Sequence, residues 1–216
     1  MVKVSVLIPV YNSQDFVGDC IKSVLAQTFE DFELILLNDA SKDASEEVIK
    51  SFDDKRIRYY KNEQNLGISG SRNRLLDLAE GEYLAIMDND DISMPKRFEK
   101  QVEFLDKNPD VAAVGTWIEL FNKRPVKGIV NRCKKMITNI GLVWCQPSEV
   151  TWKELMRANS CMHPSMMIRK SALLEHGIRY NAKYTPAEDY DLVRQFLQAG
   201  CRVCNIQEVL FRYNLH

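Results

Sequence analysis

The stretch KVSVLIPVYN, residues 3–12, sets the pattern from which the fold can be predicted. It is an apolar, β-branched run that ends in polar residues, which is typical of a buried strand. Apolar residues then recur at helical spacing from Phe16 to Leu25. Further strand-like runs and helical patterns alternate at residues 32–37, 43–51, 57–60, 68–79, 83–87 and 93–105. This alternation predicts an α/β fold, a mostly parallel sheet with helices on both faces.

The second half of the chain is less regular. Strand-like runs occupy residues 111–115, 117–121, 165–169 and 203–213, and residues 151–158 are predicted to be helical. Thr185-Pro186-Ala187-Glu188 reads as a helix start, with an N-cap, a proline at the first helical position and a glutamate three residues after the cap. Asp43 and Glu46 form a similar capping pair. No repeat or low-complexity linker interrupts residues 1–216, so one domain is predicted.

The composition excludes several classes of function. The 216 residues carry a formal net charge of -1, with acidic and basic residues interspersed, so no field attracts nucleic acid. No apolar run approaches the ~20 residues that cross a bilayer, and no signal peptide precedes the first strand. We therefore expect a cytoplasmic protein, with peripheral attachment to the inner face of a membrane left open. The Cys201–Cys204 pair is interpreted as core packing rather than a zinc or redox site.

The strongest candidate for chemistry is Asp88-Asn89-Asp90-Asp91, which directly follows a buried strand. Three carboxylates within four residues repel one another unless a cation lies among them. Hard divalent ions such as Mg²⁺ and Mn²⁺ prefer oxygen ligands. An isolated acidic turn is usually just solvated, but ligands of parallel sheets bind at the carboxyl ends of strands. The position of this turn therefore favours a metal site.

Polar residues also follow the first two strands. Tyr11 offers a ring face to a nucleobase, and Asn12 is expected to cap the following helix. Asp39 has no structural role that the sequence makes evident, and its carboxylate suits a base or a ribose. These residues are predicted to meet the acidic turn at one edge of the sheet.

Small residues and an arginine begin the helix at residues 68–79. Asn65 and Gly67 precede it, and Arg72 lies in its first turns, a combination that favours phosphate binding. The pattern is neither a P-loop nor a dinucleotide-binding GxGxxG, which disfavours a kinase or a dehydrogenase.

Two acidic residues begin the late helix. Glu188 is explained by the capping box and Asp189 by the helix dipole, and the functional alternative makes one of them a general base. His163 precedes a proline, His176 precedes a glycine at a helix end, and His216 is the last residue. No Ser-His-Asp or Cys-His order appears, so nucleophilic hydrolysis has no support.

Taken together, these segments resemble the family-2 glycosyltransferases, inverting enzymes with the Rossmann-like GT-A fold. The resemblance covers nearly the whole chain and rests on residues 6–12, 38–43, 65–67 with 71–73, 87–91, and 188–192 with Arg194. It implies transfer of a sugar from a nucleoside-diphosphate sugar, a UDP-sugar foremost, to an acceptor hydroxyl in cell-surface glycan or polysaccharide synthesis. The acceptor would be a glycan, a lipid-linked molecule or a protein.

The resemblance also implies individual roles. Asp189 would be the catalytic base, and Asp88 and Asp90 would form a DxD element that binds Mn²⁺ or Mg²⁺. The family often carries Tyr-Arg-x-His, whose histidine approaches the metal; here the segment reads Tyr213-Asn214-Leu215-His216, which makes His216 a candidate ligand. The donor would be bound by Pro9, Val10, Tyr11, Asn12, Asp39, Asn65, Gly67, Arg72, Asp88, Asn89, Asp90 and Glu188.

The resemblance divides the domain into a nucleotide-binding half, about 1–110, and an acceptor-side half, about 111–216. Because many relatives continue beyond the final motif, the acceptor-side half is expected to be truncated at its C-terminus. Two alternatives stay open: a nucleotidyltransferase acting on sugar phosphates, and a non-catalytic sugar-nucleotide binding fragment. A nucleotidyltransferase should carry a Gly-rich, Lys-bearing loop after its first strand, and residues 12–15 of this chain offer no such loop.

Overall fold

Parallel strands form the first half of a sheet in the computed structural model, which describes residues 2–123, 141–158 and 160–215. The order across this half is β3 (Ile57–Lys61), β2 (Phe32–Asn38), β1 (Val4–Val10) and β4 (Tyr83–Ile86). The helices between these strands are α1 (Val17–Leu25), α2 (Ser45–Lys50) and α3 (Gly67–Leu78). The predicted α/β alternation is confirmed, and the carboxyl ends of the four strands share one edge.

The second half of the sheet is mixed in direction. From β4 outward lie β8 (Met167–Arg169), β6 (Val111–Phe121), β9 (Arg202–Asn214) and β5 (Ile92–Ser93), with β7 (Val143–Trp144) paired to β6. The two short strands expected at residues 111–121 are one strand, β6. Its register against β9 shifts around Trp117, so what the sequence pattern shows as a break is a bulge within a continuous strand.

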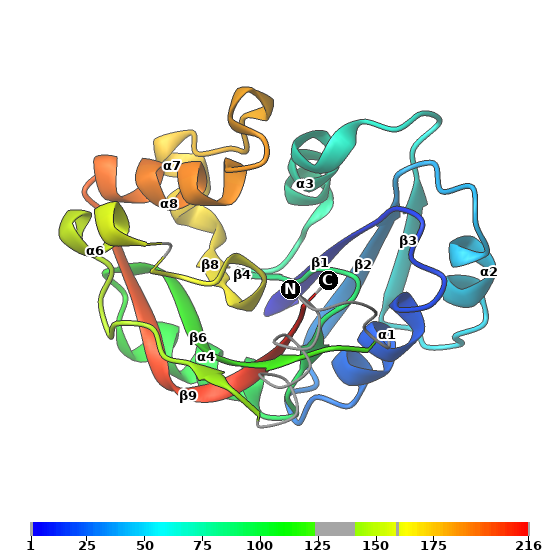
Figure 1. The fold of residues 1–216 in the computed structure, drawn as a ribbon, viewed down its shortest axis with the longest axis horizontal. Helices are drawn as coiled ribbons and strands as arrows, with labels where there is room; N and C mark the ends of the chain where they lie inside the picture. Colours follow the sequence, from blue (N-terminus) through cyan, green and yellow to red (C-terminus); the bar gives the residue numbers. More distant parts are fainter. Residues whose placement is uncertain (1, 124–140, 159, 216) are drawn as a thin grey trace, which may run out of the picture.

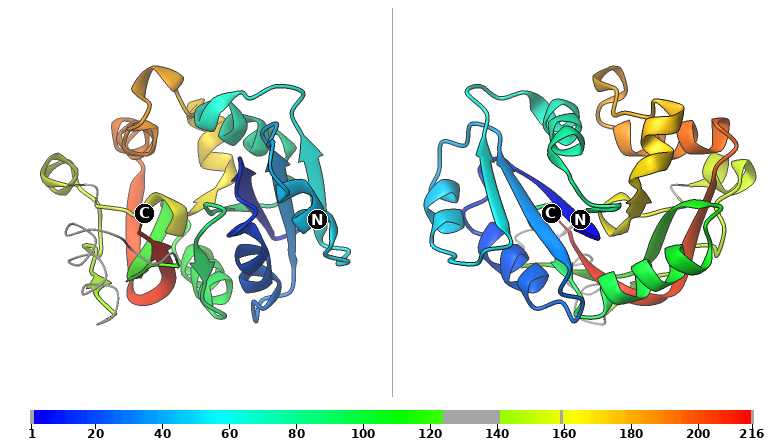
Figure 2. Two further views of the ribbon diagram at one scale, coloured as in Figure 1. Left: turned by 45° about the vertical axis from the view of Figure 1, so that its right-hand side comes forward. Right: turned by 180° about the vertical axis from the view of Figure 1, so that it is seen from behind.

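Both faces of the sheet are covered by helices, which is why every residue of β1 is buried (Figures 1 and 2). Alternate side chains of a strand point to opposite faces and so enter different cores. Val6 and Ile8 pack on the side of α1, α2 and α4 (Arg97–Lys107), whereas Leu7 packs on the side of α3, α6 (Trp152–Arg157), α7 (Lys170–His176) and α8 (Glu188–Gln198). Cys204 belongs to the first core and Cys201 packs against the second, which agrees with a packing role for both.

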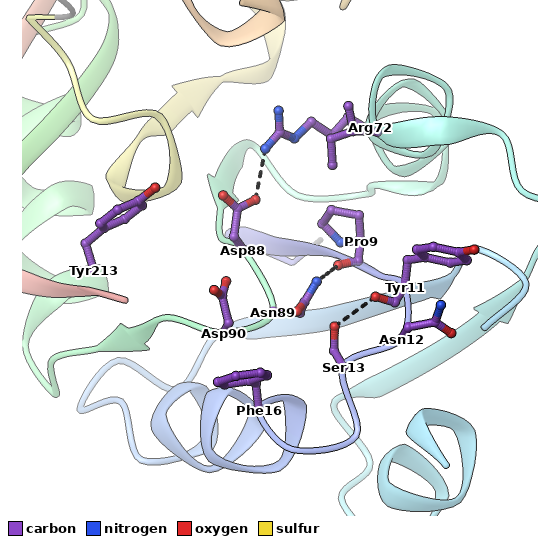
Figure 3. Close-up of a pocket in the computed structure, with 11 residues that line it drawn as sticks. Pro9, Tyr11, Asn12, Ser13, Phe16, Arg72, Asp88, Asn89, Asp90 and Tyr213 are labelled. Carbon is purple, nitrogen blue, oxygen red and sulfur yellow. Dashed lines mark hydrogen bonds and ion pairs between the residues drawn. The ribbon is translucent and has the colours of Figure 1, made fainter. Parts of the chain in front are cut away.

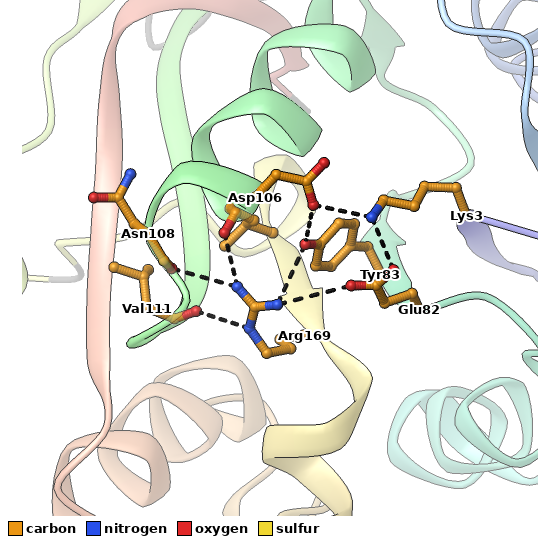
Figure 4. Close-up of polar contacts among 8 residues, drawn as sticks. Lys3, Glu82, Tyr83, Asp106, Asn108, Val111 and Arg169 are labelled. Carbon is orange, nitrogen blue, oxygen red and sulfur yellow. Dashed lines mark hydrogen bonds and ion pairs between the residues drawn. The ribbon is translucent and has the colours of Figure 1, made fainter.

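A polar network at the amino ends of β1 and β4 connects the two halves of the chain (Figure 4). We call it the amino-end network; its side chains are those of Lys3, Glu82, Tyr83, Asp106 and Arg169. Arg169 of β8 donates to the carbonyl of Leu105 at 2.9 Å and to the Tyr83 hydroxyl at 3.2 Å. The Asp106 carboxylate accepts from Lys3 at 2.9 Å and from Tyr83 at 2.6 Å. Each charge in the network therefore has an opposite charge beside it.

Several predicted helix starts are wrong in detail. The N-cap of α2 is Ala44 rather than Asp43, and Asp43 instead accepts from the amide of Ser45 at 3.0 Å. Ser93 belongs to β5, and α4 begins only at Arg97. Gly177, with φ 61°, ends α7 in the left-handed conformation, as the sequence predicts. Within the described ranges, no helix combines the length and apolar character needed to span a bilayer.

Candidate active site

Two neighbouring hollows lie at the carboxyl ends of the parallel strands. The first, which we call the acidic hollow, encloses about 420 Å³, and the second, the Asp39 hollow, about 380 Å³. They share Pro9, Tyr11, Ile68 and Asn89 as walls. The acidic hollow is also lined by Asn12, Ser13, Phe16, Arg72, Asp88, Asp90 and Tyr213, and the Asp39 hollow by Val10, Asp39, Asn65, Gly67 and Ser71. Residues from segments far apart in the sequence thus meet at one edge, and Figure 3 shows those that line the acidic hollow.

Side-chain hydrogen bonds to other loops hold the loop that follows β1. Asn12 has φ 49° and accepts from the amide of Lys42 at 2.8 Å through Oδ1. It fastens the loop after β1 to the loop after β2 and does not cap α1, whose N-cap is Phe16, so the predicted capping role is wrong. Asn89 donates to the carbonyl of Pro9 at 2.8 Å and joins the acidic turn to the same loop (Figure 3).

Asp39 is buried at the floor of the Asp39 hollow with a fixed orientation. Its Oδ1 accepts from the Asn62 side chain at 2.6 Å and from the amide of Leu66 at 2.8 Å. Two donors on one oxygen hold the carboxylate in place, and the pocket is mostly apolar around it, with Tyr11 as an exposed ring. Such a slot suits a planar base.

The acidic turn divides its carboxylates between the hollow and the core. Asp88 and Asp90 line the acidic hollow, but Asp91 is fully buried and accepts from the amide of Asn214 at 2.8 Å. Burial, together with Asp88 and Asp90, raises the pKa of Asp91 well above its usual range. The prediction that three carboxylates surround one cation is therefore wrong for Asp91. The reason is that the backbone turns inward there to pair with β9.

The two remaining carboxylates fit a hard divalent ion. Asp88 and Asp90 supply oxygen ligands two residues apart, and Mg²⁺ typically uses one or two carboxylates with waters and substrate phosphates. Among the described residues, no three His, Cys, Asp or Glu side chains form a metal site by themselves. His216 lies outside the described residues.

Arg72 supplies the positively charged side chain that lines the acidic hollow. It is only 7% exposed, donates to Asp88 at 2.9 Å and to Glu188 at 2.9 Å, and lies with its guanidinium 5.5 Å from the centre of the Tyr180 ring. Burial alone would lower the pKa of Arg72, but the neighbouring Asp88 and Tyr180 raise it, so the side chain is charged. Tyr180 in turn contacts the buried His163 ring nitrogen at 2.8 Å.

Glu188 and Asp189 begin α8, as predicted, but without the predicted capping box. The N-cap is Ala187, and Glu188 is buried against Arg72 instead of returning to Thr185. Asp189 is half-buried and accepts from the amide of Tyr190 at 2.6 Å. Burial raises the pKa of Tyr213 to about 12, and the charges of Asp91, Asp88, Asp90 and Asp189 add to this effect. Asp189 is therefore within electrostatic range of the acidic hollow, although it does not line it.

Five lining residues were not among the predicted site residues: Ser13, Phe16, Ile68, Ser71 and Tyr213. Phe16 belongs to an apolar pattern that indicates core, and Tyr213 to a strand pattern. Ser71 lies in the segment 71–73 and Tyr213 begins the segment 213–216, both of which carry the family resemblance, whereas Ser13, Phe16 and Ile68 carry no such signal.

A family model described as Glycosyl transferase family 2 matches residues 5–176. The chain belongs to this family. It is 33% identical over 219 residues to an uncharacterized glycosyltransferase of Haemophilus influenzae. The match covers 99% of this chain and 65% of that protein. It is 34% identical over 125 residues to the Escherichia coli UDP-Glc:alpha-D-GlcNAc-diphosphoundecaprenol beta-1,3-glucosyltransferase WfgD, over 58% of this chain and 49% of that one.

Solved glycosyltransferase structures share the fold of this family member. Staphylococcus aureus TarS 1–349 in complex with UDP-GlcNAc superposes with a TM-score of 0.77 at 22% identity, covering 99% of this chain and 59% of that one. The mannosyltransferase PcManGT of Pyrobaculum calidifontis, in complex with GDP-Man and Mn²⁺, gives 0.70 at 18% identity, over 99% and 57%. The fold is therefore GT-A, and the chain spans about three fifths of the lengths of these solved chains.

Proposed function

We propose that this chain is an inverting, metal-dependent glycosyltransferase that moves a sugar from a UDP-sugar to an acceptor hydroxyl. The observation that carries the proposal is the shared wall between the Asp39 hollow and the acidic hollow. A nucleoside in the first would extend its diphosphate into the second, where Arg72, Asp88 and Asp90 lie. Family membership and the nucleotide-sugar complexes of the TarS and PcManGT structures support this assignment.

The binding residues divide by chemistry. Asp39 and Tyr11 would receive the base, and Arg72 would orient a phosphate through its guanidinium fork. Asp90, with Asp88, would hold Mn²⁺ or Mg²⁺, and His216 stays a predicted further ligand. When bound, the ion neutralises the charge that develops on the leaving nucleoside diphosphate.

Asp189 is the proposed general base. It would take the proton of the acceptor hydroxyl as that oxygen attacks the anomeric carbon from the face opposite the leaving group. The bond from the acceptor oxygen forms as the bond to the diphosphate oxygen breaks, so a single displacement inverts the configuration. The single-step logic is that of inverting glycosidases.

The proposed acceptor belongs to cell-surface glycan synthesis, and WfgD supports this because its name states a lipid-diphosphate-linked sugar as acceptor. The acceptor-side half, about residues 111–216, would bind it. A place at the inner face of the membrane, with a cytoplasmic catalytic domain, fits such an acceptor.

The test is to incubate the protein with a panel of UDP-sugars and Mn²⁺ and to identify the released product. A glycosyltransferase releases UDP, whereas a nucleotidyltransferase running in reverse consumes pyrophosphate and forms UTP. Binding of UDP-sugars without any turnover, with or without glycan acceptors, would instead favour a binding fragment. Thermal shift with the same panel finds the donor, because a ligand that binds only the folded state raises its stability.

A further inference from the structure

One polar face of α3 is joined along its length to the segment that leads into α8. Asn73 exchanges two hydrogen bonds with the backbone of Tyr180, at 2.8 and 3.0 Å. On either side, Asp77 pairs with Arg179 at 2.7 Å and Arg72 pairs with Glu188 at 2.9 Å. We call this row of contacts the α3 seam. Asn73 and Asp77 are four residues apart and share one face of α3, and Arg72 directly precedes Asn73 on the adjoining face.

The inner end of the seam differs from its outer end in burial. Asp77 and Arg179 are exposed ion-pair partners, whereas the Arg72 and Glu188 side chains are 8% and 7% exposed. Glu188 Oε2 and Arg72 Nε are buried without a hydrogen-bond partner among the described residues. A buried ion pair with unsatisfied atoms is weak evidence for a stabilising role, because desolvation offsets much of its attraction. The inner pair needs another explanation.

Arg72 contacts both the proposed donor site and the residue that precedes the proposed general base, Asp189. It lines the acidic hollow and holds Asp88 there, and it is supported from behind by the Tyr180 ring. Glu188 does not line either hollow, and it immediately precedes Asp189 in the first turn of α8. Asp189 therefore directly follows Glu188, whose side chain is held by Arg72 of the acidic hollow.

We infer that Glu188 is a positioning residue for Asp189 that acts through Arg72, and not a donor-binding residue as its sequence position suggests. This inference rests on the proposed function. The Asp88–Arg72–Glu188 chain sets the distance between the reacting end of the donor and the start of α8. Misplacing a catalytic group by about 1 Å can cost ~10²-fold in rate, and a buried ion pair that fixes the start of α8 prevents such a displacement.

The test is a double-mutant cycle on UDP release from UDP-GlcNAc and UDP-glucose with Mn²⁺. Glu188→Ala is expected to lower kcat about 10- to 100-fold while KM changes less than about threefold. Arg72→Ala lowers kcat and also raises KM, because Arg72 faces the donor. If Glu188 acts through Arg72, adding Glu188→Ala to Arg72→Ala lowers kcat no further.

One control, a second pair of variants and a separate test of the proposed function complete the experiment. Glu33→Gln alters another buried carboxylate, paired with Arg58 at 2.5 Å near the amino ends of the strands, and should leave kcat unchanged. If an alanine variant fails to fold, the cycle is repeated with Glu188→Gln and Arg72→Met. The proposed function itself fails if the unaltered chain turns over no sugar nucleotide of the wider panel, or if Asp189→Asn has the same turnover as the unaltered chain. Effects of Glu188 and Arg72 that multiply, or a Glu188 variant that changes only KM, overturn the positioning role alone.

Discussion

The amino and carboxyl ends of the parallel strands both gather charged side chains, but they balance them differently. In the amino-end network, Lys3 and Arg169 lie among Glu82, Asp106 and the Tyr83 hydroxyl, with hydrogen bonds between neighbours. At the carboxyl ends, one buried arginine, Arg72, serves both Asp88 and Glu188. The amino end is thus neutralised within the chain, whereas the carboxyl end carries an excess of negative charge.

This difference separates a structural edge from a functional one. Excess carboxylates at one site repel each other, and a ligand that brings positive charge relieves the repulsion. A network that is already balanced gains nothing from a ligand. Substitutions at the carboxyl end should therefore change function more than stability, and substitutions at the amino end should do the reverse.

The largest expected effect is that of Asp189→Asn. The amide keeps the size of the side chain but cannot take the acceptor proton, so turnover should fall by at least ~10²-fold. Binding of UDP with Mn²⁺, measured by calorimetry, should change little, because Asp189 does not line the hollows. Turnover equal to that of the unaltered protein would remove Asp189 from the mechanism.

Asp90→Asn should separate function from stability at the same edge. Calorimetry of UDP binding should show a strong dependence on Mn²⁺ in the unaltered protein and none in the variant, because Asp90 is the proposed ligand. The melting temperature of the metal-free variant should stay the same or rise, since one of several neighbouring negative charges is removed. Equal affinity with and without Mn²⁺ in the unaltered protein would contradict the proposed metal site.

Much of the first half of the fold could be predicted from the sequence, because its strands are covered on both faces and its helices are amphipathic. The strand at residues 32–37, for example, lies within one residue of the observed β2. The meeting of Tyr11, Asp39 and Asp88 also follows from the sequence, since parallel strands place their carboxyl ends together. The second half was harder, because antiparallel pairing and the bulge in β6 leave no regular period.

The details of the site depended on contacts that no local pattern contains. Thr185 and Glu188 have the ideal spacing of a capping box, yet Glu188 turns to Arg72, 116 residues away in sequence. Asp91 follows Asp90 directly, but it pairs with Asn214 at the far end of the chain. In both cases a long-range partner overrides a local propensity, and both partners belong to the carboxyl-end edge.

Arg169→Met tests the structural edge. The methionine keeps the apolar stem but removes the donors to the carbonyls of Leu105, Asn108 and Val111, at 2.9 to 3.3 Å. Loss of a largely buried set of hydrogen bonds should cost about 2–3 kcal/mol, or roughly 5–10 °C in melting temperature. The rate of UDP release per folded molecule, measured well below that temperature, should not change. A loss of rate at full folding would show that the two ends are coupled.

Asp106→Asn gives the smallest expected effect and sharpens the same comparison through pH. Burial alone would raise the pKa of Asp106, but the hydrogen bonds from Tyr83 and Lys3 lower it below its ordinary value of 3.8. The stability that this carboxylate contributes is therefore fully present above the pKa of the unfolded chain and is lost as the pH falls through the lower folded value. Removing the carboxylate should reduce the difference in melting temperature between pH 7 and pH 3 by about 1–2 °C, as expected for a partly exposed ion pair.

Glu103→Gln, which alters an exposed helical pair with Lys107, is the matched control and should reduce that difference less. Equal reductions in both variants would mean that the amino-end network behaves as ordinary surface charge, and the contrast between the two ends would then rest on the carboxyl end alone.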